Sequence, residues 1–315
     1  MPKQEKILTL TMNPSIDITM NAHHVRPKEK IRCTIPQYEA GGGGINVARV
    51  IAGLGGAVHA VFPCGAALGD ILRNLVTSHD MAFTAVATQE PTRQNFAVFD
   101  VAGEGQYRFT MPGPTLSKKE WQQCLDIVEN FDPLPSYIVA SGSLPPGVPD
   151  GFYEHIALCA HKRGSRFILD TSGIPLQKGT RKGVYLLKPN MREMKTLAGA
   201  DLENEAAIRS AIQRLTRDGV AEVIILSLGA GGAFVADSDT VTHLHTPTVP
   251  IISTVGAGDS MVAGIVFGLS QGKDVRDAAA LGLAAGAAAV MTPGTELCRP
   301  ENVMALYKTM DTNML

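Results

Sequence analysis

Residues 137–170, YIVASGSLPPGVPDGFYEHIALCAHKRGSRFILD, contain the pattern that decides the fold. The stretch begins with a short apolar run, Tyr137–Ala140, and ends with another, Phe167–Asp170. Between the two runs, Gly151–Lys162 has the apolar spacing of a helix. Two buried strands that are joined by a helix usually run parallel. The stretch therefore predicts a parallel sheet covered by helices.

The same alternation of apolar runs and amphipathic segments continues along the chain. Further buried strands are predicted at Ile7–Met12, Val58–Pro63, Tyr185–Leu187 and Val223–Ser227. Further helices are predicted at Arg192–Ala198, at Glu205–Arg217 and after Ser117, which can form a capping box with Glu120. After Leu228, the segments GAFVAD and TVTHLHTP predict a hairpin that extends the main sheet. The predicted fold class is α/β, with helices on both faces of a mostly parallel sheet.

Two regions break this alternation. Residues 16–38 have alternating side chains without a helical period, and residues 95–111 indicate a hairpin that turns at 102–105. Alternation of this kind suits a sheet with one solvated face. We therefore predict that the two regions form one small sheet that acts as a lid. The domain prediction is a single domain, with a core of about 1–15, 39–92 and 112–315 and a discontinuous lid of about 16–38 and 93–111.

Composition and charge exclude several classes of protein. Hydrophobic residues make up 45% of the 315 residues, enough for a large core and too many for a disordered chain. The formal charge of −2 gives no basic field for nucleic acid. Five cysteines without zinc-site spacing indicate a reducing compartment. With neither a signal peptide nor an apolar run of membrane-spanning length, the expected location is cytoplasmic and no membrane partner is expected.

The strongest local signal is Thr254-Val-Gly-Ala-Gly-Asp-Ser260, which leads into the apolar run MVAGIVFGL. The backbone can turn tightly at Gly256 and Gly258, so that the amide groups around Ala257 converge on one point. A helix that begins there adds its positive end, which makes an anion site. Asp259 at this point suits a general base beside a phosphate. The alternative is an aspartate that caps a glycine-rich helix start.

Two other segments have a similar ambiguity. The run GGGGINVAR opens a helix with four glycines, and Asn46 would lie one turn inside it, able to bind hydroxyl groups; the alternative is a flexible hinge. In KPNMRE, Asn190 and Glu193 could face a hydrated Mg²⁺ at the end of a strand; the alternative is an ordinary capped helix start. SLGAGG, which ends another strand, offers further amide donors or forms a plain hairpin turn.

Isolated polar residues near the predicted lid are weaker candidates. Arg93, Arg108 and Lys30 lie on or beside lid segments and could bind an anion, although scattered basic residues are usually solvated. Asp17, just after the first strand, suits a ligand or a turn. Other nucleotide-binding patterns are missing, since NPSID rather than G-x-G-x-x-G follows the first strand and no Walker motif occurs. A dinucleotide-dependent dehydrogenase and a Walker-type NTPase are therefore disfavoured.

Together, GGGGINVAR and STVGAGDSMVAG resemble the ribokinase-like carbohydrate kinases, and within them the phosphofructokinase B group. The resemblance also rests on TLTMNPSID, TRQN, QYRFTMPGP, ASGSLPPGVP, LKPN, SLGAGG and AAAVMTPGTELC. It implies a ribokinase-like three-layer αβα sandwich with a small β-sheet lid. It also implies transfer of phosphate from MgATP to a sugar phosphate.

The first-half motifs are most similar to the minor bacterial 6-phosphofructokinases, which implies phosphorylation of fructose 6-phosphate at O1, a step of glycolysis. Kinases of tagatose 6-phosphate or fructose 1-phosphate usually have Lys where this chain has Gly43. Those two activities remain alternatives. A non-catalytic sugar-phosphate sensor is an alternative of a different class.

The resemblance also assigns roles to individual residues. It makes Asp259 the base that takes the proton of the sugar hydroxyl, with the amides of Gly256, Ala257 and Gly258 as the anion hole. The positions that match the sugar-phosphate side are Asp17, Gly42, Gly43, Asn46, Arg93, Arg108, Ser143 and Lys30. Lys30 matches a lid lysine that reaches a phosphate in its own or the neighbouring subunit. The positions that match the side of the nucleotide and Mg²⁺ are Lys188, Asn190, Glu193, Ser227, Gly229, Gly232, Thr254 and Gly256.

Two further features follow from the resemblance and from the predicted lid. Proteins of this group often bind K⁺, and the matching carbonyl positions are Ser253, Val255, Ala289 and Gly294. The chain departs from the related enzyme, which has Asn and Arg at the positions of Thr292 and Glu296, so a K⁺ requirement stays open. The lid strands would expose their edges, and pairing across a two-fold axis protects such edges. We therefore expect a homodimer through the lid.

Overall fold

A large sheet forms the centre of the molecule in the computed structural model, which describes residues 6–103, 105–294 and 296–310. Its strands lie in the order β13-β12-β11-β10-β9-β8-β1-β4-β5. They are β1 (Ile7–Leu10), β4 (Val58–Gly65), β5 (Ala82–Thr88), β8 (Tyr137–Ser141), β9 (Arg166–Asp170), β10 (Val184–Leu187), β11 (Ala221–Ser227), β12 (Ala233–Ala236) and β13 (Val241–Leu244). Neighbouring strands pair parallel from β5 to β11, whereas β12 and β13 pair antiparallel. The predicted mostly parallel sheet is confirmed.

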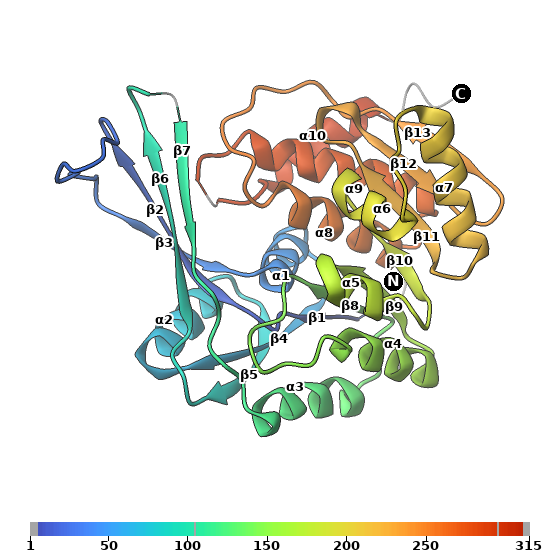
Figure 1. Cartoon of the computed structure of the whole chain (residues 1–315), viewed down its shortest axis with the longest axis horizontal. Helices are drawn as coiled ribbons and strands as arrows, with labels where there is room; N and C mark the ends of the chain where they lie inside the picture. Colours follow the sequence, from blue (N-terminus) through green and yellow to red (C-terminus); the bar gives the residue numbers. More distant parts are fainter. Residues whose placement is uncertain (1–5, 104, 295, 311–315) are drawn as a thin grey trace.

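Helices cover both faces of this sheet (Figure 1). They are α1 (Gly43–Gly53), α2 (Ala66–Thr77), α3 (Lys118–Asn130), α4 (Phe152–Arg163), α5 (Gly173–Gly179), α6 (Met191–Ala198), α7 (Glu205–Arg217), α8 (Ala257–Ser270), α9 (Val275–Val290) and α10 (Pro300–Met310). Successive residues of β8 belong to different clusters of the core. Ile138 packs in the cluster that contains residues of α3, α4 and α7, and Val139 packs in the cluster that contains residues of α8, α9 and α10. Both faces of the strand are buried, which explains its uninterrupted apolar sequence.

Local sequence signals correctly predicted several elements. The helix predicted at residues 205–217 has those bounds in the structure, and Ser117 and Glu120 form the predicted capping box at the start of α3. The hairpin predicted after Leu228 is present as β12 and β13. β5, with the sequence AFTAVAT, was not predicted. This strand lies at the edge of the sheet, and most of its residues are half-buried or exposed. Such a strand has no continuous apolar run to reveal it.

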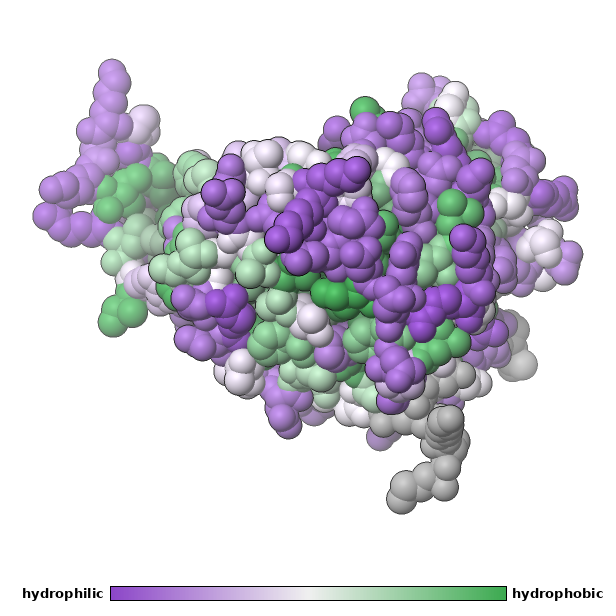
Figure 2. Space-filling model, turned by 90° about the horizontal axis from the view of Figure 1, so that it is seen from below, coloured by the Kyte–Doolittle hydropathy of each residue, from purple (hydrophilic) through white to green (hydrophobic). Residues whose placement is uncertain are grey.

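The predicted small sheet is also present and projects from the core (Figure 1). It contains β2 (Ser15–Ala22), β3 (Gln37–Gly41), β6 (Arg93–Asp100) and β7 (Gly105–Thr110), in the order β3-β2-β6-β7. The predicted hairpin is the antiparallel pair β6–β7; Glu104 in its predicted turn lies outside the described residues. Tyr107 and Phe109 of β7 are exposed, and Figure 2 shows apolar residues beside polar ones on the projecting part of the molecule. The small sheet thus has a large accessible apolar surface.

Glycines allow α8 and α9 to approach each other very closely. A side chain at Gly264 of α8 would place its Cβ 2.7 Å from the carbonyl oxygen of Leu281, and one at Gly282 of α9 would place it 2.7 Å from that of Met261. No such contact is tolerable, so any larger residue would push the helices apart. This packing fixes the start of α8 against the core. Among the described residues, no helix combines the length and the apolar character needed to cross a membrane.

Candidate active site

The starts of α1 and α8 meet through their side chains. Asn46 Nδ2 donates a hydrogen bond of 2.8 Å to Asp259 Oδ2, although the two residues are 213 positions apart in the sequence. Both side chains belong to the first turns of their helices. The two glycine-containing segments of the sequence therefore form one site, with a single carboxylate at its centre.

The start of α8 has the geometry of an anion site. Gly256 caps the helix in a left-handed conformation, with φ of 75°, and contributes no side-chain hydrogen bond. Asp259 lies inside the first turn, so the interpretation of Asp259 as the capping residue is wrong. The first amides of a helix have no acceptor within the helix, so those of Ala257 and Gly258 are available to an anion. Asp259 as a residue is half-buried at this point.

The glycines at the start of α1 serve close packing, not a flexible hinge. Gly42 precedes the helix with φ of 111°, which favours glycine. A Cβ at Gly43 would overlap Ser141 Oγ, and one at Gly44 would lie 2.6 Å from the carbonyl oxygen of Leu10. The helix therefore begins directly against the carboxyl ends of β1 and β8. In parallel sheets this is the edge at which ligands bind.

A buried charge pair lies next to Asp259. Lys188 Nζ is 3.3 Å from Asp170 Oδ1, and only 6% of the lysine side chain is exposed. Burial disfavours the charged lysine, but the carboxylates of Asp170, Glu193 and Asp259 outweigh it and raise the pKa of Lys188. Burial and the charge of Asp170 raise the pKa of Asp259 to about 7. Asp259 is thus poised to exchange a proton near neutral pH.

Asp170 is a site residue that the sequence analysis missed. It ends β9, and its Oδ2 accepts a hydrogen bond of 3.2 Å from Ser141 Oγ, the group that Gly43 approaches. The only signal for it was an acidic residue at the end of a predicted parallel strand. Asp170 contacts the ammonium of Lys188 directly, and the charges of Glu193 and Asp259 also act on it. The negative charges near this lysine thus outnumber its single positive charge, which suits a divalent cation held partly through water and phosphate.

The predicted Mg²⁺ residues form a capped helix start. Asn190 Oδ1 accepts from the amide of Glu193 at 3.0 Å, and Glu193 Oε2 accepts from the amide of Asn190 at 2.9 Å. This arrangement is the ordinary capping box named as the alternative, and it leaves the second carboxylate oxygen of Glu193 outside the box. Within the part of the chain that the structure describes, no three acidic, histidine or cysteine side chains form a ready-made metal cage. Mg²⁺ commonly keeps water and phosphate ligands, which fits such a loose arrangement.

A cavity of about 430 Å³ lies beside the start of α8. It brings together the predicted nucleotide residues Ser227, Gly229, Gly232 and Thr254 with Ala257 and Gly258 of the anion site. Most of the apolar wall of this cavity was not predicted from the sequence. It includes Pro247, Val249, Ile251, Met261, Leu283, Ala287 and Val290. These residues form no sequence motif. A polar end at a helix start and an apolar far end suit a phosphorylated ligand with an aromatic ring.

A much smaller polar cavity, of about 30 Å³, lies at the base of the small sheet. Asp17, Asn95 and Arg108 line it together with Val255. Asp17 Oδ1 accepts hydrogen bonds from Ser15 Oγ at 2.7 Å and from Asn95 Nδ2 at 2.9 Å. Arg108 is exposed, so its guanidinium is accessible to an anion. The structure therefore places Asp17 and Arg108, predicted from distant segments, at one location.

The other predicted sugar-phosphate residues are more dispersed. Arg93 donates to the backbone carbonyls of Met111 and Asn13, at 2.9 Å each, so it braces the segments that flank the small sheet. The hydroxyl of Ser143 accepts from Asn13 Nδ2 at 3.1 Å. Lys30 is exposed on the segment between β2 and β3, and it lines neither of the two cavities.

Comparison with known proteins agrees with this geometry. The model of a family described as pfkB family carbohydrate kinase matches residues 10–302. The chain belongs to the pfkB family of carbohydrate kinases.

Individual members of the family are similar over nearly the whole chain. The ATP-dependent 6-phosphofructokinase isozyme 2 of Mycobacterium tuberculosis (strain ATCC 25618 / H37Rv) is 41% identical over 303 residues, which cover 96% of this chain and 89% of the relative. A crystal structure of phosphofructokinase-2 from Escherichia coli in complex with fructose-6-phosphate matches with a TM-score of 0.92 and 36% identity, over 98% of this chain and 99% of that one. The same Escherichia coli protein in complex with potassium matches with a TM-score of 0.93 and 38% identity, over the same shares. These matches confirm the predicted ribokinase-like fold.

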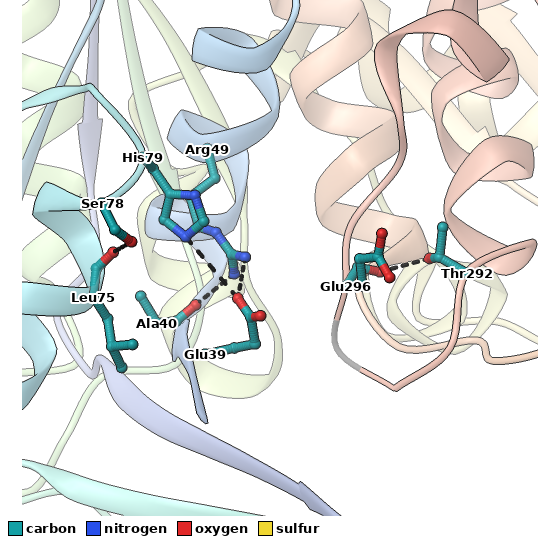
Figure 3. A network of polar contacts seen from close by, with 8 residues as sticks. All are labelled: Glu39, Ala40, Arg49, Leu75, Ser78, His79, Thr292 and Glu296. Atoms are coloured by element: carbon teal, nitrogen blue, oxygen red, sulfur yellow. Dashed lines mark hydrogen bonds and ion pairs between the residues drawn. The ribbon is translucent and has the colours of Figure 1, made fainter. Parts of the chain in front are cut away.

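In this pfkB-family chain, a buried arginine fastens the small sheet to α1. Arg49, the last residue of GGGGINVAR, donates from Nη1 to the carbonyl of Ala40 at 2.8 Å and pairs through Nη2 with Glu39 of β3 (Figure 3). Burial and the charge of Arg49 lower the pKa of the neighbouring His79 to about 4, so His79 is neutral. Its place in the motif did not indicate this role. The contacts show that it joins the small sheet to the helix that carries Asn46.

The carbonyl positions matched to K⁺ lie among hydroxyl groups. Ser253 Oγ donates to the carbonyl of Gly294 at 2.9 Å. Thr292 Oγ1 lies 2.7 Å from the carbonyl of Ala289 and 2.6 Å from that of Glu296 (Figure 3 shows the second contact). The carbonyl of Ala289 also accepts from the backbone amide of Thr292 at 3.2 Å. The hydroxyl of Thr292 thus lies between two of the carbonyl groups at this end of α9, one of them a position matched to K⁺.

Proposed function

We propose that this protein phosphorylates fructose 6-phosphate at O1 with ATP, which gives fructose 1,6-bisphosphate and ADP. The observation that carries the proposal is the position of Asp259. Asn46 holds its carboxylate at the start of α8, directly after Ala257 and Gly258 of the 430 Å³ cavity, and the charge of Asp17 in the small sheet also acts on it. The names of the 6-phosphofructokinase relatives support the choice of substrate.

The two substrates would bind on opposite sides of this carboxylate. The adenine ring suits the apolar wall of the 430 Å³ cavity, and the phosphates suit the amides at its Ala257–Gly258 end. The sugar phosphate suits the side of Asp17 and Arg108, where a carboxylate can bind hydroxyls and a guanidinium can bind phosphate. The bound hydroxyl and the terminal phosphate of ATP would then meet at Asp259.

The chemical step needs one proton acceptor and strong charge neutralisation. The O1 hydroxyl forms a bond to the γ-phosphorus, the bond from that phosphorus to the bridging oxygen of ADP breaks, and the O1 proton passes to Asp259. The amides of α8 and the ammonium of Lys188 stabilise the negative charge on the transferred group. Mg²⁺, when bound with the nucleotide, would supply further positive charge to neutralise the phosphates. Asp170, Glu193 and, within its capping box, Asn190 are the side chains that would hold it through water.

Three assignments extend this proposal. The carbonyls of Ser253, Val255, Ala289 and Gly294 would hold K⁺ beside the anion site, supported by the potassium complex of the related Escherichia coli protein. The exposed apolar side chains of the small sheet would pair with those of a second copy, which would make the protein a homodimer. The free cysteines among the described residues support a cytoplasmic location.

A coupled assay of ADP release tests the proposed function. The purified protein is supplied with MgATP and, in turn, with fructose 6-phosphate, tagatose 6-phosphate and fructose 1-phosphate. We expect the highest kcat/KM with fructose 6-phosphate. A higher value for one of the other sugars would replace the proposed substrate with that sugar, and tight sugar-phosphate binding without ADP release would favour a non-catalytic sensor.

A further inference from the structure

The turn between β11 and β12 forms part of the wall of the 430 Å³ cavity. It is a short 3₁₀ turn, Gly229–Gly231, and both Gly229 and Gly232 line the cavity. Three local backbone bonds close the turn: Gly231 donates to Leu228 at 3.1 Å, Gly232 donates to Gly229 at 3.1 Å, and Leu228 donates to Gly232 at 2.9 Å. No side chain of the turn itself caps it. All three bonds lie within the turn, so its glycine-rich backbone gains a restraint toward the rest of the fold only from groups outside it.

His243 of β13 supplies such a restraint. Its Nε2 lies 2.8 Å from the carbonyl oxygen of Gly231. A carbonyl oxygen only accepts hydrogen bonds, so Nε2 must carry the hydrogen. This is possible both for the neutral imidazole, as one of its two tautomers, and for the protonated form. His243 therefore donates to the turn in either state.

An aromatic stack fixes the orientation of the imidazole. The ring of Phe234 lies 4.5 Å from that of His243 with an angle of 26° between their planes, and the ring of His245 lies 4.6 Å away. The guanidinium of Arg209 lies 4.9 Å from the centre of the Phe234 ring and also donates to the carbonyl of Val241 at 2.7 Å. A side chain held between neighbours in this way loses little further freedom when it donates its hydrogen bond.

The turn also packs directly on the strand that carries His243. Gly232 has φ of 87°, and a Cβ at this position would overlap the carbonyl oxygen of Leu244. The backbone of the turn and that of β13 are therefore in close contact next to the His243 bond. The restraint thus runs from the main sheet, through β13, to the wall of the cavity.

From these contacts we infer that His243 is a positioning residue for the nucleotide: it holds the Gly229–Gly231 turn in the shape that binds ATP. This inference rests on the proposed function, in which the nucleotide occupies the 430 Å³ cavity. His243 does not line that cavity and has no contact with Asp259, so its loss should weaken nucleotide binding without altering phosphoryl transfer. Nothing in the sequence motifs pointed to this histidine, because its role depends on the pairing of β12 with β13.

The test compares His243→Ala, His243→Gln and the unchanged protein. The amide nitrogen of glutamine can replace Nε2 as a donor, whereas alanine removes the bond. The dissociation constant of a fluorescent ATP analogue is measured directly, and KM for ATP, KM for fructose 6-phosphate and kcat are measured in the ADP-release assay. His161→Ala, an exposed histidine on α4, is the matched control. Thermal unfolding verifies that every variant is folded.

For His243→Ala we expect the dissociation constant and KM of ATP to rise roughly threefold to tenfold, the effect of one lost hydrogen bond. We expect kcat and the KM of the sugar phosphate to stay within about twofold, and His243→Gln to recover most of the ATP affinity. Faster amide hydrogen exchange in a peptide that covers residues 228–233 should accompany the alanine change.

Two results would overturn the inference: unchanged ATP affinity in His243→Ala, or a glutamine variant that binds ATP no better than the alanine variant. In both cases the unchanged protein still binds ATP, so the proposed function stands. If the unchanged protein itself does not bind the nucleotide, the proposed function fails first and this inference fails with it.

Discussion

The two proposed substrate sites beside Asp259 differ in how fully the protein encloses them. The nucleotide side is a cavity of about 430 Å³ with walls from the core of the protein, whereas the polar cavity at the base of the small sheet measures about 30 Å³. A sugar phosphate is larger than the smaller space. We therefore expect movement of the small sheet or a second subunit to complete the sugar side, while the proposed nucleotide side is largely preformed.

Asp259 takes part in the reaction of both substrates, so we expect its loss to affect neither KM selectively. We expect Asp259→Asn to lower kcat by at least about 100-fold, the low end for loss of a general base, with little change in either KM. The matched control is Asp277→Asn. Asp277 occupies the same first-turn position in α9 that Asp259 occupies in α8, but it lies outside the site. Near-normal turnover of Asp259→Asn would remove the carboxylate from its proposed role.

Arg108 should affect the sugar side alone. We expect Arg108→Ala to raise KM for fructose 6-phosphate by about 10- to 50-fold, the effect of a lost charge-assisted hydrogen bond to phosphate, while KM for ATP stays unchanged. Steady-state kinetics with each substrate varied in turn measure both values. Arg276→Ala, an exposed arginine on α9, is the control. An equal rise in both KM values would contradict the separation of the two sides.

Val290 should affect the nucleotide side alone. It lines the apolar end of the 430 Å³ cavity, and Val290→Phe would fill part of the space assigned to the adenine ring. We expect KM for ATP to rise about tenfold, as for other overpacked pockets, and KM for the sugar phosphate to stay the same. Val275→Phe, at the far end of the same helix, controls for the added ring. If ATP affinity survives in Val290→Phe, the nucleotide must bind elsewhere.

The pH dependence of kcat/KM is a second test of Asp259. Burial and Asp170 raise the pKa of Asp259 to about 7, and a base must be ionised to accept a proton, so kcat/KM should fall about tenfold from pH 8 to pH 6. The profile is measured with each substrate limiting in turn. Because both substrates depend on Asp259, the two profiles should bend at the same pH. A bend near pH 4 would show that the carboxylate has an ordinary pKa.

The raised pKa of Asp259 also predicts how the stability of the protein depends on pH. Activity should rise with pH, whereas the free energy of unfolding should fall. Unfolded Asp259 loses its proton near pH 3.8 and the folded residue near pH 7, so the folded protein holds more protons between these values and stability falls as the pH rises. Above about pH 7 the full cost of the ionised, buried group remains. Asp259→Asn should therefore stabilise the protein by about 1–2 kcal/mol at pH 8, a value reduced because the side chain is partly exposed, and by much less at pH 4. Thermal unfolding at the two pH values measures the difference.

The sequence predicted the elements whose environment is uniform along their length. β8, α4 and β9 were found because a strand buried on both faces is continuously apolar and a helix buried on one face has a regular period. β5 was missed because an edge strand has neither property. Asn46 and Asp259 were found because the glycines beside them are needed for close approach, which leaves a clear mark in the sequence.

The rest of the site depends on tertiary contacts. Asp170 is a single acidic residue at the end of a strand, and only the packing of β9 next to β10 brings it to Lys188. The apolar wall of the nucleotide cavity combines a loop with residues of α8 and α9, so no local pattern marks it. Arg93 shows the reverse case. Its sequence position suggested an anion ligand, whereas its donors are committed to backbone carbonyls.

The close contact of α8 with α9 affects how precisely Asp259 is positioned in each catalytic cycle. In-line transfer tolerates little misplacement, and an error of about 1 Å between reacting groups can reduce a rate by about two orders of magnitude. Gly264 and Gly282 bring the helix that carries Asp259 into close contact with α9, which opposes a shift of one helix along the other. If the small sheet moves over a bound sugar as a lid, it would close over a proton acceptor whose position this packing holds. Enlarging either glycine should therefore broaden the distribution of reactive geometries before it unfolds the protein.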